Sequence, residues 1–273
     1  MRILVTNDDG IGAPGLVALV REMVGVGNIV VVAPERQQSA GGHAITLHKP
    51  LRLERVAFPV AEAEAYATNG TPADCVILGC LGLERRPDLV VAGINAGANL
   101  GEEVLYSGTV SAAMEAAING IPAFAISVLA YLNCTFHPAA AFAARLAANV
   151  CGLNLPQAGF LNVNVPNCPA SEIAGVKVTR LGRRSYLNQL EKRVDPRGRA
   201  HYWFSGEAEE ADAGEGTDIG ATAASFISIT PIHFDLTSYE SMDALSTMVA
   251  ALASDGMPMP PGDGDSEPCH PVQ

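Results

Sequence analysis

Short apolar runs alternate with Ala-rich stretches along the chain as far as Val165. The apolar runs are rich in β-branched residues and apolar on both faces, which is typical of parallel strands covered by helices on each side. Alternation of strands and helices favours right-handed crossovers and a doubly wound sheet. We therefore predict an α/β fold, in which the order of the strands stays open. The expected strands lie at 2–6, 28–33, 88–93, 123–127 and 160–165, and the expected helices at 15–24, 71–80, 107–119 and 136–150.

The pattern changes after Pro166. Residues 175–207 alternate apolar and polar positions, carry many Arg and Lys, and contain the turn sequence DPRGR from Asp195, which predicts a long antiparallel hairpin. This arm either packs on its own domain or reaches a second subunit. We expect one α/β domain over 1–254 and a disordered tail, rich in Pro, Gly and acidic residues, over 255–273. After the hairpin we expect an acidic loop from Glu207, a short helix after Thr217, a strand over 225–237 and a helix over 241–252.

The charge of the chain narrows the range of partners. The 273 residues carry a formal net charge of −12, so the average surface repels nucleic acid. A small phosphorylated substrate is compatible with this charge where helix N-termini, a few basic side chains or a metal ion offset it locally. Hydrophobic residues make up 48% of the chain and aromatic residues only 5%, which fits helices packed on a parallel sheet better than an aromatic-rich β-sandwich.

The six cysteines form no C-x-x-C pair, which argues against zinc-finger and thioredoxin-like sites. They are typical of small buried residues in a reducing compartment. No apolar segment reaches the ~18 residues of a membrane span, and Met1 leads directly into a strand-like run rather than a signal peptide. We therefore expect a cytoplasmic protein that makes no membrane contact.

Two adjacent carboxylates follow the first predicted strand, in the sequence VTNDDGIGAPGL from Val5. On a regular strand Asp8 and Asp9 would point to opposite faces and one would be buried without a partner, whereas at a strand end both can converge. Two carboxylates within ~4 Å repel each other unless a cation lies between them, and such hard oxygen ligands suit Mg²⁺, Mn²⁺ or Ca²⁺. The alternative is that the two acids cap the turn and the following helix.

Polar residues also follow two other predicted strands. Ser39 lies on a glycine-rich loop after the second strand, and Asn95 and Asn99 follow the strand at 88–93. Ligands of open α/β sheets bind beyond the carboxyl ends of the strands, and hydroxyl and amide oxygens can bind hard cations or phosphate. Taken alone, Ser39 is better explained as an ordinary loop serine.

Two hydroxyl-bearing turns precede predicted helices. Ser107, Gly108 and Thr109 begin the helix in YSGTVSAAMEAA, where hydroxyls, backbone N–H groups and the helix dipole could form a phosphate cradle. The run TNGTPAD repeats this arrangement with Asn69 and Thr71. In both turns the alternative is an N-cap, which is the commoner use of Ser and Thr at such positions.

The familiar nucleotide-binding and hydrolase motifs are absent from the sequence. DDGIGAPG places its glycines at Gly10, Gly12 and Gly15, which is not the G-x-G-x-x-G spacing, and its carboxylates would repel a pyrophosphate unless a metal intervened. Neither a P-loop nor a G-x-S-x-G elbow occurs.

Taken together, the motifs resemble the SurE family, the survival-protein nucleotidases. The resemblance implies a Rossmann-like core with a C-terminal extension that exchanges between the subunits of a homodimer or homotetramer. It also implies a metal-dependent phosphatase that hydrolyses nucleoside 5′-monophosphates to nucleoside and phosphate, with 3′-monophosphates as further candidate substrates. The matching runs are collinear over 3–237 and are ILVTNDDGIGAPGL, VVAPERQQSAGGHAITLHKPLR, NGTPADCV, PDLVVAGINAGANLGEEVLYSGTVSAAMEAAINGIPAFAIS, LNVNVP and SFISITPIHFDLT.

The resemblance also implies roles for single residues. One divalent cation per subunit, Mg²⁺ or Mn²⁺ and in crystals also Ca²⁺, would be held by Asp8, Asp9, Ser39 and Asn95. Asp8 and Asp9 are then the catalytic candidates, whether as ligand, base or nucleophile, and a metal-activated water is the preferred attacking group. The candidates for binding the substrate phosphate are Asn69, Asn99, Ser107, Gly108 and Thr109.

Two residues depart from the family pattern. Ala92 stands before the GIN sequence and Ala96 follows Asn95, and both bear on the shape of the pocket without removing a ligand. The residues alone leave two other functions open: a non-catalytic nucleotide-binding or regulatory protein on the same fold, and a sugar-nucleotide transferase that uses metal-bound carboxylates. A phosphatase turns over a nucleoside monophosphate, whereas a non-catalytic binding protein does not. A transferase is identified by its consumption of a nucleoside diphosphate sugar.

Overall fold

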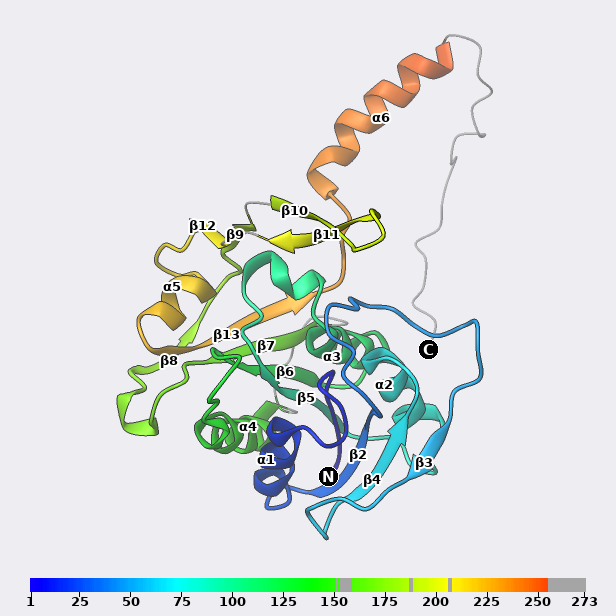
Figure 1. Cartoon of the computed structure of the whole chain (residues 1–273). Helices are drawn as coiled ribbons and strands as arrows, with labels where there is room; N and C mark the ends of the chain where they lie inside the picture. The colour runs from blue at the N-terminus through cyan, green and yellow to red at the C-terminus, as the bar shows by residue number, and fades with distance from the viewer. Residues whose placement is uncertain (151, 153–158, 187–188, 206–207, 255–273) are drawn as a thin grey trace, which may run out of the picture. The chain divides into compact units, whose positions relative to one another are not determined.

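The computed structural model describes residues 1–150, 152, 159–186, 189–205 and 208–254. Among these residues, the main body is a nine-stranded sheet in the order β3-β4-β2-β1-β5-β6-β7-β13-β8 (Figure 1). The strands from β4 to β7 in this order run parallel, whereas β3 is antiparallel to β4 and β13 is antiparallel to β7. The predicted α/β class and doubly wound, mostly parallel sheet are therefore confirmed.

The central strands lie close to their expected bounds. They are β1 (Arg2–Thr6), β2 (Asn28–Pro34), β5 (Leu89–Ala96), β6 (Ala123–Val128) and β7 (Gly159–Val165), and most of their residues are buried. Two strands that we do not predict, β3 (Leu53–Arg55) and β4 (Glu64–Thr68), extend one edge of the sheet. β3 exposes most of its residues and β4 alternates half-buried and buried ones, so neither forms a continuous apolar run.

Helices cover both faces of the sheet. α1 (Pro14–Met23) packs against α4 (Phe136–Val150) on one face, and α2 (Pro72–Leu81) packs against α3 (Gly108–Ile118) on the other (Figure 1). Each pair encloses its own hydrophobic core. Burial on both sides explains why the strands are apolar on both faces. Cys75 and Cys80 are buried free thiols of the second core, as expected for small apolar residues.

The order of the strands creates a ligand site. The chain begins in the middle of the sheet, continues from β1 to β2 and β4 on one side, and then crosses to β5, β6 and β7 on the other. The order therefore reverses between β1 and β5, and ligands of doubly wound sheets bind beyond the carboxyl ends of the strands at such a switch point. β1 ends at Thr6, just before Asp8 and Asp9, and β5 ends at Ala96.

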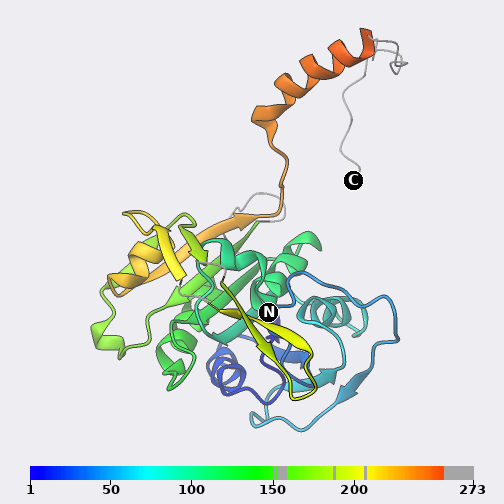
Figure 2. The same ribbon diagram turned by 45° about the horizontal axis from the view of Figure 1, so that its top comes forward.

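Residues 175–207 do not form one long hairpin. β8 (Gly175–Val178) pairs with β13 (Phe226–His233) in the main sheet, and β9 (Arg183–Tyr186) pairs with β12 (Ala208–Asp212). The antiparallel hairpin consists of β10 (Gln189–Val194) and β11 (Ala200–Ser205) (Figure 2). The acidic segment expected as a loop supplies β12, which pairs antiparallel with β9.

Among the shorter elements, α5 follows its prediction closely, whereas the two 3₁₀ helices are not predicted. α5 (Asp218–Ala223) begins after Thr217, whose hydroxyl accepts a hydrogen bond from the N–H of Gly220 (3.0 Å), as in an N-cap. The 3₁₀ helices η1 (Gly101–Leu105) and η2 (Ala170–Glu172) connect larger elements.

α6 (Tyr239–Ser254) belongs to a separate unit that begins at Asp235. It carries exposed apolar side chains at Met242, Leu245, Val249 and Leu252. In the part of the chain that the structure describes, no helix is both long enough and apolar enough to cross a membrane. The predicted tail at 255–273 lies outside the described residues.

Candidate active site

A pocket of about 330 Å³ lies at the carboxyl ends of β1, β2 and β5. The structure thus gathers side chains from separate segments of the chain into one cavity at the switch point. Of the residues selected from the sequence, Asp8, Asp9, Ser39, Asn95, Asn99 and Ser107 line it. The other lining residues are Gln37, Ala40, Ala96, Ala98, Glu103, Tyr106 and Tyr131.

Asn7 holds the turn after β1 together by side-chain hydrogen bonds. It is fully buried, and we do not single it out from the sequence. The Asn7 Nδ2 donates to the carbonyl oxygen of Gly10 (3.0 Å), and its Oδ1 accepts from the N–H of Gly10 (3.2 Å). Gly10 has φ = +100°, a conformation that favours glycine. The Asp8 carbonyl oxygen accepts from the backbone N–H of Gln38 (2.7 Å). These bonds turn the chain out of the strand, so Asp8 and Asp9 both line the pocket.

Asp8 is almost completely buried, with 4% of its surface exposed. Its Oδ1 accepts a hydrogen bond from the hydroxyl of Thr109, at the start of α3. Burial raises the pKa of the Asp8 carboxyl to about 6; repulsion from Asp9 raises it as well, and the Thr109 hydrogen bond opposes both. The fold therefore holds a carboxyl group whose negative charge is unfavourable unless a cation lies beside it.

Asp9 lies next to Asp8 and is partly exposed to the pocket. Its Oδ2 accepts from the backbone N–H of Ala96 (3.4 Å), and its Oδ1 accepts from Gln37 Nε2 (3.3 Å). Burial raises the pKa of the Asp9 carboxyl, and these two hydrogen bonds lower it. The Ala96 contact joins the end of β5 to the turn after β1, across the switch point.

Neutral oxygens surround the two carboxylates. Gln37 Nε2 donates to the Oγ of Ser39 (2.8 Å) as well as to Asp9, so one amide orients two predicted metal ligands. Asn95 Nδ2 donates to the carbonyl oxygen of Gly97 (2.7 Å), which leaves the Asn95 Oδ1 for a ligand. The pocket therefore presents carboxylate, hydroxyl and amide oxygens together.

The N-terminus of α3 packs directly on Asp8. A Cβ atom at Gly108 would lie 2.8 Å from the Asp8 Cβ, so only glycine allows this approach. Thr109 is fully buried and its hydroxyl is bonded to Asp8. Ser107 caps the helix, because its Oγ accepts from the N–H of Val110 (3.1 Å). Of these three residues, Ser107 lines the pocket, Gly108 makes room for Asp8, and Thr109 orients it.

The two predicted asparagines lie in different places. Asn99 lines the pocket and is held rigidly, since its Nδ2 donates to the Oγ of buried Ser127 (2.7 Å). Asn69 is not among the residues that line this pocket, and its Oδ1 accepts from the backbone N–H of Arg52 (2.8 Å). Asn69 therefore fixes the loop before β3. The neighbouring Thr71 is the N-cap of α2, in agreement with the capping alternative.

Two tyrosines that are not among the site residues predicted from the sequence also line the pocket. Tyr106 follows η1 and is 68% exposed, and Tyr131 follows β6 and is 75% exposed. A side chain at Gly97 would collide with the ring of Tyr131, so the bare backbone at Gly97 makes room for that ring. The two rings add apolar surface to a pocket whose inner part is polar.

Comparison with known proteins decides the family. The model of the family described as survival protein SurE matches residues 3–188. The chain belongs to the SurE family. A curated relative from Moorella thermoacetica, named 5′-nucleotidase SurE, is 51% identical over 253 residues, which cover 92% of this chain and 97% of the relative. One of the same name from Carboxydothermus hydrogenoformans is also 51% identical, over 257 residues that cover 92% and 97%.

The SurE fold is found in a solved structure as well. The crystal structure of the SurE protein from Aquifex aeolicus matches with a TM-score of 0.80 and 41% identity, and the match covers 91% of this chain and 100% of that chain. The family expected from the sequence motifs is therefore confirmed by sequence and by structure.

The SurE site offers the donor set of a hard cation. Within the described ranges, no group of three or more His, Cys, Asp or Glu side chains could hold a metal ion. A cation in this pocket would therefore need neutral oxygens in addition to the two carboxylates, and Ser39 and Asn95 present such oxygens. Oxygen ligands of this kind suit Mg²⁺ or Mn²⁺ better than zinc. The residues present fit the divalent cation that the resemblance implies.

The raised pKa of Asp8 predicts that Asp8→Asn stabilises the metal-free SurE protein. The amide oxygen can still accept from Thr109, and no charge is buried. A carboxyl whose folded pKa of about 6 exceeds its ordinary value of 3.8 destabilises the folded state above that pH, and the penalty disappears as the pH falls toward 3.8. We expect the variant to exceed wild type in free energy of unfolding by roughly 2 to 3 kcal/mol at pH 7, and by far less near pH 4.

Urea unfolding in EDTA at the two pH values measures this difference. Adding Mg²⁺ should reverse the order at neutral pH, because a ligand that binds only the folded wild type stabilises it. An advantage of the variant that does not shrink at low pH would argue against a buried charge at Asp8.

Proposed function

We propose that this SurE protein is a metal-dependent phosphatase that hydrolyses nucleoside 5′-monophosphates to nucleoside and phosphate. The observation that carries the proposal is the pair Asp8 and Asp9, whose carboxyl pKa values are raised, beside the oxygens of Ser39 and Asn95 in one pocket. The name 5′-nucleotidase SurE of relatives 51% identical to this chain supports nucleoside monophosphates as the substrate class.

One Mg²⁺ or Mn²⁺ ion would be held by Asp8, Asp9, Ser39 and Asn95. When bound, such an ion supplies the positive charge that polarises a phosphate oxygen and lowers the pKa of a water. Ca²⁺ has the same preference for oxygen ligands and is the alternative occupant. The ion also explains how a chain with a net charge of −12 can hold a phosphate.

The surrounding residues keep these ligands in place. Thr109 holds Asp8 from α3, and Gln37 holds both Asp9 and Ser39 from the loop after β2. Because α3 and the loop after β2 both hold the ligands, the ligand set is formed before substrate arrives, which reduces the reorganisation that catalysis would otherwise require.

The rest of the pocket suits the two ends of a nucleoside monophosphate. Ser107 and the N-terminus of α3 lie on the phosphate side, where the helix dipole favours negative charge. Tyr106 and Tyr131 offer aromatic surfaces, on which a base can stack. This division into a polar inner part and an aromatic outer part fits a phosphate joined to a nucleoside.

The test is phosphate release by the metal-stripped protein after addition of Mg²⁺ or Mn²⁺. We expect release from AMP and GMP that EDTA abolishes, and 3′-AMP is included as a further candidate substrate. Saturable nucleotide binding without turnover under any metal would instead show a regulatory protein. Consumption of a nucleoside diphosphate sugar, with the monophosphate only as product, would show a transferase.

We also propose that the chain forms a homodimer or homotetramer through its C-terminal part. The β10–β11 hairpin supports this, because its register places Leu190, Val194 and Tyr202 on one face and each is about 60% exposed. Exposed apolar residues that share a face are typical of protein–protein contacts.

A double variant tests the part played by this hairpin. Leu190→Glu combined with Tyr202→Glu should shift the protein toward monomers in size-exclusion chromatography with light scattering, because charges replace the exposed apolar face. Leu81→Glu, at another exposed leucine, which ends α2, is the control and should leave the mass unchanged. An unaltered mass in the double variant would exclude this face from the subunit contact.

A further inference from the structure

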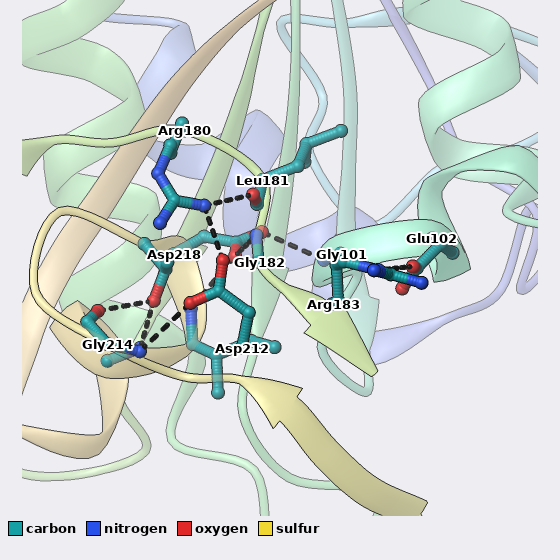
Figure 3. A network of polar contacts seen from close by, with 12 residues as sticks. Gly101, Glu102, Arg180, Leu181, Gly182, Arg183, Asp212, Gly214 and Asp218 are labelled. Atoms are coloured by element: carbon teal, nitrogen blue, oxygen red, sulfur yellow. Dashed lines mark hydrogen bonds and ion pairs between the residues drawn. The ribbon is translucent and has the colours of Figure 1, made fainter. Parts of the chain in front are cut away.

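A second buried carboxylate lies outside the pocket, at the start of α5. Asp218 is fully buried and accepts three backbone hydrogen bonds. Its Oδ1 accepts from the N–H of Gly182 (2.7 Å), and its Oδ2 accepts from the N–H of Gly101 (2.9 Å) (Figure 3). Its Oδ1 also accepts from the N–H of Ile219 (2.9 Å). The side chain therefore joins α5, the loop before β9 and η1.

The local packing requires this arrangement. A Cβ atom at Gly182 would lie 2.6 Å from the carbonyl oxygen of Asp212 and 2.8 Å from the Ile219 side chain, so only glycine brings the Gly182 N–H to Asp218. Gly101 has φ = +52°, where glycine is favoured, and it is separated from Asp218 by 117 residues. The bond to Gly101 is thus a long-range link between the C-terminal elements and η1.

The segment 100–106, which contains η1 and is held by this link, forms part of the pocket wall. Its two ends are fixed independently, since the Asn99 N–H donates to Asn164 Oδ1 (2.8 Å) and Ser107 caps α3. Between these ends, Glu103 and Tyr106 line the pocket. The middle of the segment therefore depends on contacts that come from outside the site.

The polar contacts that hold the segment 100–106 from outside the pocket differ in strength. The Gly101–Asp218 bond is buried and uses a carboxylate, which makes it stronger than a bond between neutral groups. The ion pair of Arg183 with Glu102 is long (3.5 Å between Nε and Oε1) and exposed, so it contributes little (Figure 3). The Tyr106 carbonyl oxygen accepts from the N–H of Gly42 (3.1 Å). Asp218 is the buried anchor among these polar contacts, and Val104 adds apolar packing in the second core.

We propose that Asp218 is a positioning residue for the nucleoside part of the substrate. It holds η1 so that Glu103 and Tyr106 lie where the nucleoside would contact them, while Asp8 and Asp9 are held by other elements. The inference rests on the proposed function, because it divides the pocket into a phosphate side and a nucleoside side. Loss of the anchor should thus weaken nucleotide binding and spare the reaction at the phosphate.

Asp218→Asn tests this with two substrates. Its amide oxygen can keep the two bonds from Gly182 and Ile219, whereas its NH₂ group would face the N–H of Gly101 and break that link. We expect KM for AMP to rise about tenfold, because one hydrogen bond to a carboxylate is lost. For p-nitrophenyl phosphate, which has no nucleoside, KM should stay within about twofold, as should kcat for both substrates.

Thr217→Val is the matched control. It removes the cap of α5, in which the Gly220 N–H donates to Thr217 Oγ1, and leaves the Gly101 bond in place. It should lower Tm without changing KM for either substrate. A loss that is equal for both substrates in Asp218→Asn would show a merely structural role and overturn the inference.

A measurement on the unchanged protein covers the case in which Asp218→Asn fails to fold. The Gly101 amide should be protected from hydrogen exchange to the same degree as that of Gly182, since both bond to one buried carboxylate. Rapid exchange at the Gly101 amide, with a protected Gly182 amide, would overturn the link.

The two proposals fail in different ways. If wild type hydrolyses AMP and Asp218→Asn keeps its KM, only this inference fails. If wild type releases no phosphate from any nucleotide, the proposed function fails.

Discussion

Replacing Asp9 with asparagine is expected to lower phosphate release from AMP on the order of 10³-fold at neutral pH in saturating Mn²⁺. Asparagine has the same shape and keeps one oxygen that can accept from Ala96 or Gln37. It removes one of the two carboxylates that would hold the cation, so the charge that offsets the phosphate is lost with it. Steady-state phosphate release, measured while the metal concentration is varied, separates weaker metal binding from slower turnover.

Asp88→Asn is the matched control for this variant. Asp88 precedes β5, at the opposite end of the strand from the pocket, and its Oδ2 accepts from the N–H of Arg2 (2.7 Å), a bond that the amide oxygen can keep. Its activity should stay within about twofold of wild type. Phosphate release that survives both Asp9→Asn and EDTA would contradict a metal held at Asp9.

Replacing Gly108 with alanine is expected to lower phosphate release about 100-fold and to leave the protein folded. Gly108 is the first residue of α3, where alanine has a higher helix propensity than glycine. A Cβ there would nevertheless lie 2.8 Å from the Asp8 Cβ, 3.0 Å from the Asp8 Oδ2 and 3.1 Å from the Cγ of Pro72. Asp8 would have to leave the position in which Thr109 holds it, and the ligand set would be displaced.

Gly12→Ala is the matched control for Gly108→Ala. Gly12 lies in the same motif as the two carboxylates but is exposed, and a Cβ there would have no neighbour within 4 Å. We expect normal activity, because nothing near Asp8 has to move. Circular dichroism and Tm establish that both variants are folded, and equal activity of the two would show that the close approach at Gly108 is not required.

The central strands can be predicted from the sequence because both of their faces are covered. β1, β2, β5, β6 and β7 bury most of their residues, so each is mainly apolar, although β7 also buries Asn162 and Asn164. β4 alternates buried and half-buried residues, and β3 is a short, mostly exposed strand. β12 is acidic and pairs with β9, from which it is distant in sequence, so composition alone indicates a loop.

The metal-ligand candidates can be found in the sequence because they follow strands. Asp8 and Asp9 lie just after the end of β1, and Asn95 is the second-last residue of β5, so the apolar runs of these strands are enough to locate them. Gln37 and Tyr131 lie in loops whose paths depend on tertiary contacts, and no local pattern identifies them.

The hydrogen-bond partner of Thr109 could not be predicted from the sequence. A hydroxyl at a helix N-terminus predicts a cap or an anion site. In the structure the Thr109 hydroxyl instead donates to Asp8, which is separated from it by 101 residues. The identity of its partner is set by the packing of α3 against the end of β1, which no spacing in the sequence reveals.

We expect Asp8, Asp9, Ser39 and Asn95 to share one divalent cation. Anomalous scattering from a crystal of the wild-type protein soaked in Mn²⁺ tests it most directly. We expect one peak in the pocket, with an oxygen of each carboxylate within about 2.0 to 2.6 Å and with Ser39 and Asn95 bound directly or through water. A pocket without a peak at saturating Mn²⁺, or a peak bound by other side chains, would contradict it.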